Sequence, residues 1–317
     1  MTLPEIAKLG HVALVTPDLV KSLWFFRDVV GLEVTEERND TVYLRAWGDF
    51  EHHTLSLTAG EKAYVDHIGW KAKRAEDVEG FAQLLEKSGT EVTWVKAGEE
   101  VGQGEAIRFK LPSQHSFEIY FNMEKPLAEK NKRSILKNQT YRSWRNGISP
   151  RRIDHVNIAS SMDITDIQEY LAKQLGFKLR EYVGEDATQM KGAWMSVTNL
   201  VHDVALTSRP GLDKPNHFHH ISYWLDDAQD LLRAADILSE QGIKFIGPGK
   251  HGITQAMYLY VIDPGSGCRL ELFSGGYLIF EPDWEPIAWT MEERSTGNTY
   301  WGDSVQDKEE NQLTIEA

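Results

Sequence analysis

The sequence predicts an α+β fold made of four βαβββ modules, paired into two similar domains that each form curved mixed sheets around a cleft. Four segments open with a histidine followed by Val or Ile in a short apolar run: GHVAL at His11, DHIGW at His67, DHVNIA at His155 and HHISYW at His220. Each histidine is followed 20 to 22 residues later by a glycine that opens an extended run: GLEV, GTEV, GFKL and GIKF. Repetition at a nearly constant interval indicates one structural unit used several times.

The elements of each module follow in a fixed order. The histidine run is expected to be the first strand, and the stretch after it has apolar residues at helical spacing. The glycine is expected to end that helix in a left-handed conformation and to start the second strand. Two further apolar-rich runs complete each module: TVYLRAW and HTLSLT, IRFKLP and SFEIYF, WMSVT and HDVALT, YLYVID and RLELF.

The modules divide the chain into domains. Residues 1–135 are expected to form the N-terminal domain, and residues 151–285 the C-terminal domain, which carries the active site. The polar, basic and turn-rich segment between them predicts a linker at 136–150. Residues 286–317 read as a C-terminal extension, with a charged last dozen residues, QDKEENQLTIEA, expected to be mobile.

Composition excludes several classes of protein. The 317 residues have a formal net charge of -14, which argues against nucleic acid or an anionic membrane as a partner. The one cysteine, Cys268, excludes an internal disulfide framework. Because neither a long apolar run nor a signal-peptide pattern is present, we expect a cytoplasmic protein.

Three residues in the C-terminal half are candidate metal ligands. The sequence contains no HExxH, CxxC pair, GxSxG or complete P-loop, so ligands must be sought on separate strands by repeat position. In HFHHISYW the repeat selects His220, which faces away from its two neighbouring histidines. His155, His220 and Glu271 then supply two imidazoles and one carboxylate, leaving about three metal positions open, as non-haem Fe(II) oxygen chemistry requires.

The N-terminal half repeats this pattern. His11, His67 and Glu118 stand at the corresponding positions, and the interval of 51 residues from His67 to Glu118 equals that from His220 to Glu271. The pattern has two interpretations: two metal sites, or one site and the relic of a duplication.

Proton-transfer groups distinguish the two halves. The C-terminal half adds His202, His251 and Tyr260, which could exchange protons with a bound substrate. In the N-terminal half His53 matches His202, nothing matches His251, and Arg108 stands in the place of Tyr260. This asymmetry favours a single working site in the C-terminal half.

The segments DHVN, LVHDVAL, HHIS, GPGKHGITQAMYLYVIDP and RLELFSGGY together resemble the extradiol ring-cleaving dioxygenases of the catechol 2,3-dioxygenase type, in the vicinal oxygen chelate superfamily. The resemblance runs from His11 to about Gly302. It implies a homo-oligomer, a tetramer by analogy, whose N-terminal half holds no metal, and it favours Fe(II) over Mn(II). It also implies roles for individual residues: His155, His220 and Glu271 as metal ligands, His202, His251 and Tyr260 around them, and Asn157 and Trp194 near the substrate, with His251 and Tyr260 also contacting it.

The reaction that this resemblance implies is cleavage of a catechol by O₂ beside its two hydroxyl groups, giving a 2-hydroxymuconic semialdehyde. His202 is expected to be the acid and base. Because Arg294 stands alone in the tail EERSTGNTYWG, we expect small neutral catechols, such as catechol and methylcatechols, as in aromatic hydrocarbon catabolism. The alternatives are a two-ring substrate of the biphenyl-diol type, a glyoxalase-like metal-dependent isomerase or lyase, and a binding module without activity.

Overall fold

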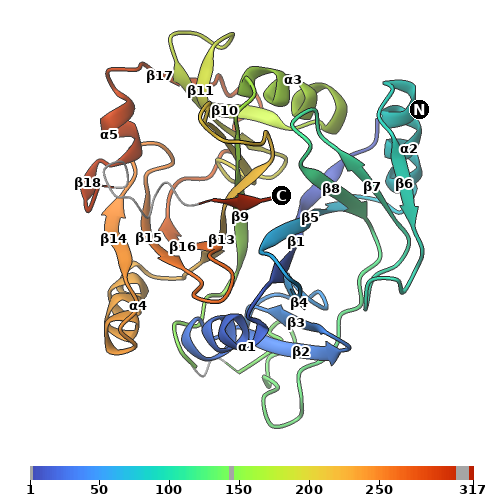
Figure 1. The fold of residues 1–317 in the computed structure, drawn as a ribbon, viewed down its shortest axis with the longest axis vertical. Coiled ribbons are helices and arrows are strands. Elements are labelled where there is room, and N and C mark those ends of the chain that lie inside the picture. Colours follow the sequence, from blue (N-terminus) through green and yellow to red (C-terminus); the bar gives the residue numbers. More distant parts are fainter. Residues whose placement is uncertain (1–2, 143–145, 305–313) are drawn as a thin grey trace.

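The computed structural model describes residues 3–142, 146–304 and 314–317, and within them all four predicted βαβββ modules are present (Figure 1). The first module consists of β1 (Ile6–Thr16), α1 (Leu19–Leu23) continued by the π-helix η1 (Trp24–Val29), β2 (Glu33–Arg38), β3 (Thr41–Arg45) and β4 (Leu55–Ala59). The second consists of β5 (Tyr64–Ala72), α2 (Glu76–Lys87), β6 (Val92–Val95), β7 (Ala106–Lys110) and β8 (Ser116–Tyr120).

The C-terminal domain repeats this order. The third module consists of β9 (Arg152–Ser160), α3 (Ile164–Leu175), β10 (Lys178–Gly184), β11 (Met190–Ser196) and β12 (Val204–Ser208). The fourth consists of β13 (His217–Trp224), α4 (Ala228–Glu240), β14 (Phe245–Lys250), β15 (Ala256–Ile262) and β16 (Arg269–Gly275).

The four repeat glycines end their helices as predicted. Gly31, Gly89, Gly176 and Gly242 have φ angles of 86°, 85°, 76° and 68°. This left-handed conformation costs a residue with a Cβ atom more than it costs glycine. The constant interval from histidine to glycine is therefore the length of a strand and the helix after it.

Strand pairing joins the two modules of each domain edge to edge. In the N-terminal domain β1 pairs with β4 in its own module and with β5 in the next, and in the C-terminal domain β9 pairs in the same way with β12 and β13. Each domain is thus a curved sheet whose first strands meet in the middle. The two central strands and the last strand beside them carry the repeat histidines and carboxylates.

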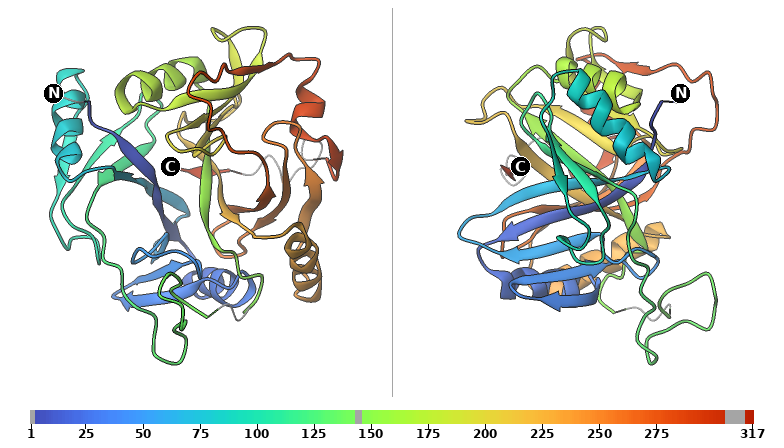
Figure 2. Two further views of the ribbon diagram at one scale, coloured as in Figure 1. Left: turned by 180° about the vertical axis from the view of Figure 1, so that it is seen from behind. Right: turned by 90° about the vertical axis from the view of Figure 1, so that its right-hand side faces the viewer.

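The two domains pack against each other through apolar and polar contacts. The ring of Trp70 meets that of Phe177 edge-on at 4.9 Å between centroids. Thr54 and Tyr223 share a buried hydrogen bond of 3.0 Å across the interface. Helices α2 and α3 lie side by side on the outside of the sheets (Figure 2). Among the described residues, no helix is long and apolar enough to cross a membrane.

The C-terminal extension is more ordered than the sequence suggested. It contains β17 (Ile287–Trp289), which pairs with β10, and α5 (Arg294–Asn298). It continues with β18 (Trp301–Gly302), which pairs with β14, and ends in β19 (Ile315–Glu316), which pairs with β13 of one domain and β5 of the other. Of the last dozen residues, expected to be mobile, Ile315 and Glu316 thus join the sheet, while 306–313 lie outside the described residues.

Candidate metal centre and active site

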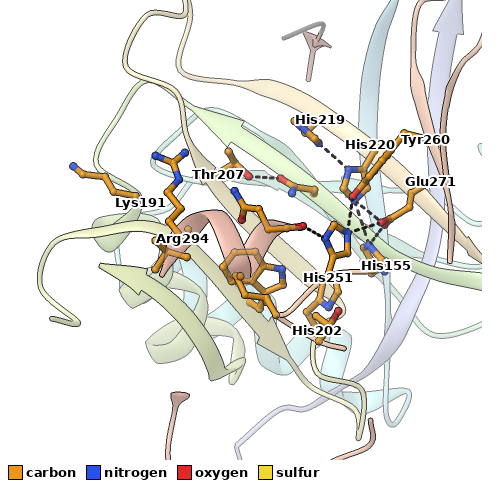
Figure 3. A pocket seen from close by; sticks show the side chains of 18 of the residues that line it. His155, Lys191, His202, Thr207, His219, His220, His251, Tyr260, Glu271 and Arg294 are labelled. Carbon is orange, nitrogen blue, oxygen red and sulfur yellow. Dashed lines mark hydrogen bonds and ion pairs between the residues drawn. The ribbon is translucent and has the colours of Figure 1, made fainter. Parts of the chain in front are cut away.

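Three neighbouring strands of the C-terminal domain bring His155, His220 and Glu271 together (Figure 3). They lie on β9, β13 and β16, and β13 pairs with both of the others. The Nε2 atoms of His155 and His220 are 3.2 Å apart, and they lie 2.8 and 3.3 Å from Glu271 Oε2. All three side chains are buried.

Hydrogen bonds fix how these side chains present their ligand atoms. Nδ1 of His155 lies 2.9 Å from Asp154 Oδ2, so it donates its proton there and Nε2 faces Glu271. Burial alone would lower the pKa of His155, but Asp154 and Glu271 together raise it to about 9. Burial lowers the pKa of His220 to about 3. Two buried nitrogens and a carboxylate oxygen that face one point form a donor set suited to a divalent first-row metal.

Tyr260 and His251 stand beside the carboxylate. Tyr260 lies directly opposite Glu271 in the β15–β16 pair. Nε2 of His251 is 3.2 Å from the Tyr260 hydroxyl and 3.4 Å from Glu271 Oε1. On its other side, Nδ1 of His251 donates to the backbone carbonyl of Asn298, at the end of α5. Burial and the nearby Glu271 raise the pKa of Tyr260 well above its usual range, so the phenol is neutral.

His202 lies just before β12, against the first histidine of the set. The centroid of its ring is 3.9 Å from that of His155. Burial, reinforced by His155, lowers the pKa of His202 well below its usual range. A neutral imidazole here can accept a proton from a group in the cavity.

The predicted residues line one cavity of about 520 Å³. Asn157 and Trp194 contribute to its wall, and Asn157 Oδ1 accepts a hydrogen bond of 3.0 Å from Thr207. The structure therefore gathers all the residues proposed for the site: His155, Asn157, Trp194, His202, His220, His251, Tyr260 and Glu271.

Sequence reasoning missed part of the cavity wall. Lys191 and Arg209 line it together with Arg294, which was the only cation expected there. Lys191 and Arg294 lie toward the end away from Glu271 (Figure 3). Arg209 directly follows β12, which ends at Ser208, and nothing in the sequence marked it as a cavity residue. No sequence signal would have brought Asn298 of the extension to His251.

Comparison with known proteins identifies the family. Residues 65–125 match the catechol 2,3-dioxygenase-like N-terminal domain, and residues 152–272 match the glyoxalase/bleomycin resistance protein/dioxygenase superfamily. The manganese-dependent 2,3-dihydroxybiphenyl 1,2-dioxygenase of Geobacillus genomosp. 3 is 56% identical over 95% of this chain and 96% of its own length. The metapyrocatechase of Geobacillus stearothermophilus is 38% identical over 96% and 92%. The chain belongs to the extradiol dioxygenases of the catechol 2,3-dioxygenase type.

The fold of this extradiol dioxygenase agrees with that of a solved relative. The 2,3-dioxygenase LapB from Pseudomonas sp. KL28 superposes with a TM-score of 0.81 at 31% identity, covering 92% of this chain and all of LapB. The predicted family and the predicted α+β fold of the vicinal oxygen chelate type are thereby confirmed. The enzyme is an oxidoreductase, which excludes the alternative of a binding module without activity.

Proposed function

We propose that this extradiol dioxygenase cleaves its catechol at a single divalent metal held by His155, His220 and Glu271 in the C-terminal domain. The observation that carries the proposal is the convergence of two Nε2 atoms and one carboxylate oxygen within 3.3 Å of one another at the end of a cavity of about 520 Å³. Three ligands on one side of a metal leave the other positions for the two catechol oxygens and O₂. The metal would supply a positive charge that favours the ionised catechol and a path for electrons to oxygen.

The surrounding residues would then bind the substrate and exchange protons with it. His202 would accept and return a proton, since burial keeps its imidazole neutral. The phenol of Tyr260 and the imidazole of His251 would hydrogen-bond the catechol oxygens and fix their orientation. Asn157 and Trp194 would form the wall against which the ring lies.

The metal itself is proposed to be Fe(II) or Mn(II). The donor set accepts both, because two imidazoles and one carboxylate do not discriminate strongly between these neighbouring ions. The sequence favoured Fe(II), but the relative that is 56% identical is named as manganese-dependent, which supports Mn(II). Metal analysis of the purified protein, followed by reconstitution of the metal-free protein with each ion, tests the choice.

For the substrate, we propose a neutral catechol, with a two-ring diol preferred over the small catechols that the sequence favoured. The cavity of about 520 Å³ lies in the range of roughly 300–1,000 Å³ typical of pockets for drug-sized ligands, which exceeds the need of one ring. The 56% identical relative is named for 2,3-dihydroxybiphenyl. However, Lys191 and Arg209 also line the cavity, and their positive charges could bind the carboxylate of an acidic catechol.

The experiment compares kcat/KM on catechol, 3-methylcatechol, 2,3-dihydroxybiphenyl and 3,4-dihydroxyphenylacetate, with O₂ uptake as the readout. We expect the biphenyl diol to have the highest value and the carboxylate-bearing catechol the lowest. A highest value on the carboxylate would overturn the neutral-substrate proposal and assign the cavity cations to substrate binding. O₂ uptake by the metal-free protein would refute the proposed centre itself.

A further inference from the structure

The N-terminal domain contains a second cluster of potential metal ligands, built on the same strands. His11 of β1 and His67 of β5 place their Nε2 atoms 3.0 Å apart, close to the 3.2 Å between His155 and His220. Nδ1 of His67 lies 2.8 Å from Asp66 Oδ2, an arrangement that matches the hydrogen bond of His155 to Asp154. The duplication has thus kept the ligand geometry and also one of the hydrogen bonds that orient it.

A carboxylate that the repeat alignment did not find completes this cluster. Glu100 lies in the connection between β6 and β7, the counterpart of the β14–β15 connection that supplies His251. Its oxygens lie 3.2 Å from His67 Nε2 and 3.5 Å from His11 Nε2, and 3.0 Å from Nε2 of His53. Ligands about 2.1 Å from a metal and at right angles to each other lie about 3 Å apart, so these separations suit a bound cation.

The charges in this cluster allow a divalent ion despite the presence of an arginine. Arg108 Nε binds Glu118 Oε2 at 2.6 Å, and Gln103 binds the other oxygen of Glu118 at 2.7 Å. The same guanidinium also lies 3.1 Å from Glu100 Oε2 and 3.4 Å from His67 Nε2, so Arg108 is shared by both carboxylates. Glu100, Glu118 and Arg108 together carry one net negative charge, the same as that of Glu271 in the C-terminal centre.

Two glycines leave room for the rings in and beside this cluster. A Cβ atom on Gly69 would lie 2.2 Å from the ring of His11, and one on Gly10 would lie 2.1 Å from the hydroxyl oxygen of Tyr120. Nδ1 of His11 is buried and has no hydrogen-bond partner among the described residues.

We propose that His11, His67 and Glu100 bind a divalent first-row cation in a closed structural site, with Glu118 as a second carboxylate nearby. All four side chains are buried, which leaves no access for a catechol and separates this site from the catalytic one. Closed coordination is typical of structural metals. The competing occupant is a proton: burial lowers the pKa of His67, but Glu100, Glu118 and Asp66 raise it to about 10, so His67 can be a cation when no metal is bound.

Metal stoichiometry distinguishes these occupants. The metal-free wild type and the variants His220→Ala, His67→Ala and His220→Ala/His67→Ala are brought to equilibrium with Mn(II) by dialysis, and bound Mn(II) is counted per chain. We expect about two ions in the wild type, one in each single variant and none in the double variant. The control His217→Ala, outside both clusters, should bind two.

Two further measurements protect this result from misfolding. Glu100→Gln keeps the shape of the side chain and should also reduce binding to one ion, and Mn(II) should raise the melting temperature of His220→Ala but not of the double variant. If His220→Ala binds no Mn(II), or His67→Ala binds as much as the wild type, the N-terminal site is refuted and a proton occupies it. If His220→Ala binds as much as the wild type, the proposed catalytic centre fails instead.

Discussion

His115 links the N-terminal domain to the strand that carries a proposed metal ligand, and protonation of this buried imidazole should destabilise the folded protein. It lies before β8, is fully buried, and its Nδ1 accepts from Ser113 at 2.8 Å. Its Nε2 donates across the domain interface to the backbone carbonyl of His217 at 2.9 Å. His217 is on β13, three residues before His220.

The size of the effect follows from the pKa of this imidazole. Burial lowers the pKa of His115 from 6.5 to about 4. Because the pKa is lower in the folded chain than in the unfolded chain, the stabilisation is present above pH 6.5 and is lost as the pH falls toward 4. A difference of 2.5 units corresponds to about 3.4 kcal/mol in full, of which about 2 kcal/mol is lost at pH 5.

The assay compares His115→Gln with the wild type by scanning calorimetry at pH 7.5 and pH 5.0. Glutamine can form similar hydrogen bonds but takes up no proton. The wild type should therefore lose about 4 °C or more of melting temperature beyond the loss in the variant, at about 2–4 °C per kcal/mol. Other titrating groups act in both proteins and cancel, and the control His217→Gln should lose as much as the wild type. Equal losses in His115→Gln and the wild type would refute the reasoning.

Three further predictions concern the C-terminal domain. His202→Phe keeps a ring against His155, so metal content should stay near that of the wild type while turnover falls by about 10²- to 10⁴-fold; loss of metal would make His202 a ligand, and unchanged turnover would make it structural. Tyr260→Arg places a cation opposite the one carboxylate of its centre and should remove the metal, which Tyr260→Phe should retain; atomic absorption decides between these outcomes. Burial raises the pKa of Asp203 from 3.8 to about 6, so this group's stabilisation is present below pH 3.8 and lost as the pH rises through 6. Asp203→Asn should thus raise the melting temperature, relative to the wild type, more at pH 7.5 than at pH 4.5. The difference corresponds to about 2 kcal/mol in the free energy of unfolding, and a larger gain at pH 4.5 would contradict this.

The sequence predicted the parts of this enzyme that the repeat determines. His155, His220 and Glu271 could be found because each sits at a fixed position in its module, and strand alternation decides which face it occupies. The four glycines could be found because only their left-handed conformation allows the helix to end there. Both signals depend only on residues near each position, so they can be recognised in a single sequence.

The remaining features depend on contacts between distant segments. Glu100 was missed because it lies in a loop outside the repeat register, and only the curvature of the sheet brings it to His67. Strands β17 and β18 have three and two residues, too few to show alternation, and they form because edge strands β10 and β14 offer free hydrogen-bonding groups. The closure of the cavity by α5 follows from these pairings.

The two clusters differ in the pair of side chains beside their ligands. In the C-terminal domain this pair is an imidazole and a phenol, with His251 Nε2 3.2 Å from the Tyr260 hydroxyl. In the N-terminal domain the corresponding strand and connection supply Arg108 and Glu100, an ion pair at 3.1 Å. Arg108 by itself would repel a bound metal. Because Glu100 accompanies it, the two side chains together leave the net charge of the cluster unchanged. The His251–Tyr260 pair lines a cavity, whereas Arg108 and Glu100 bind each other in a buried cluster. The C-terminal cluster thus opens to a cavity and the N-terminal cluster is closed, while both retain a donor set suited to the same class of cation.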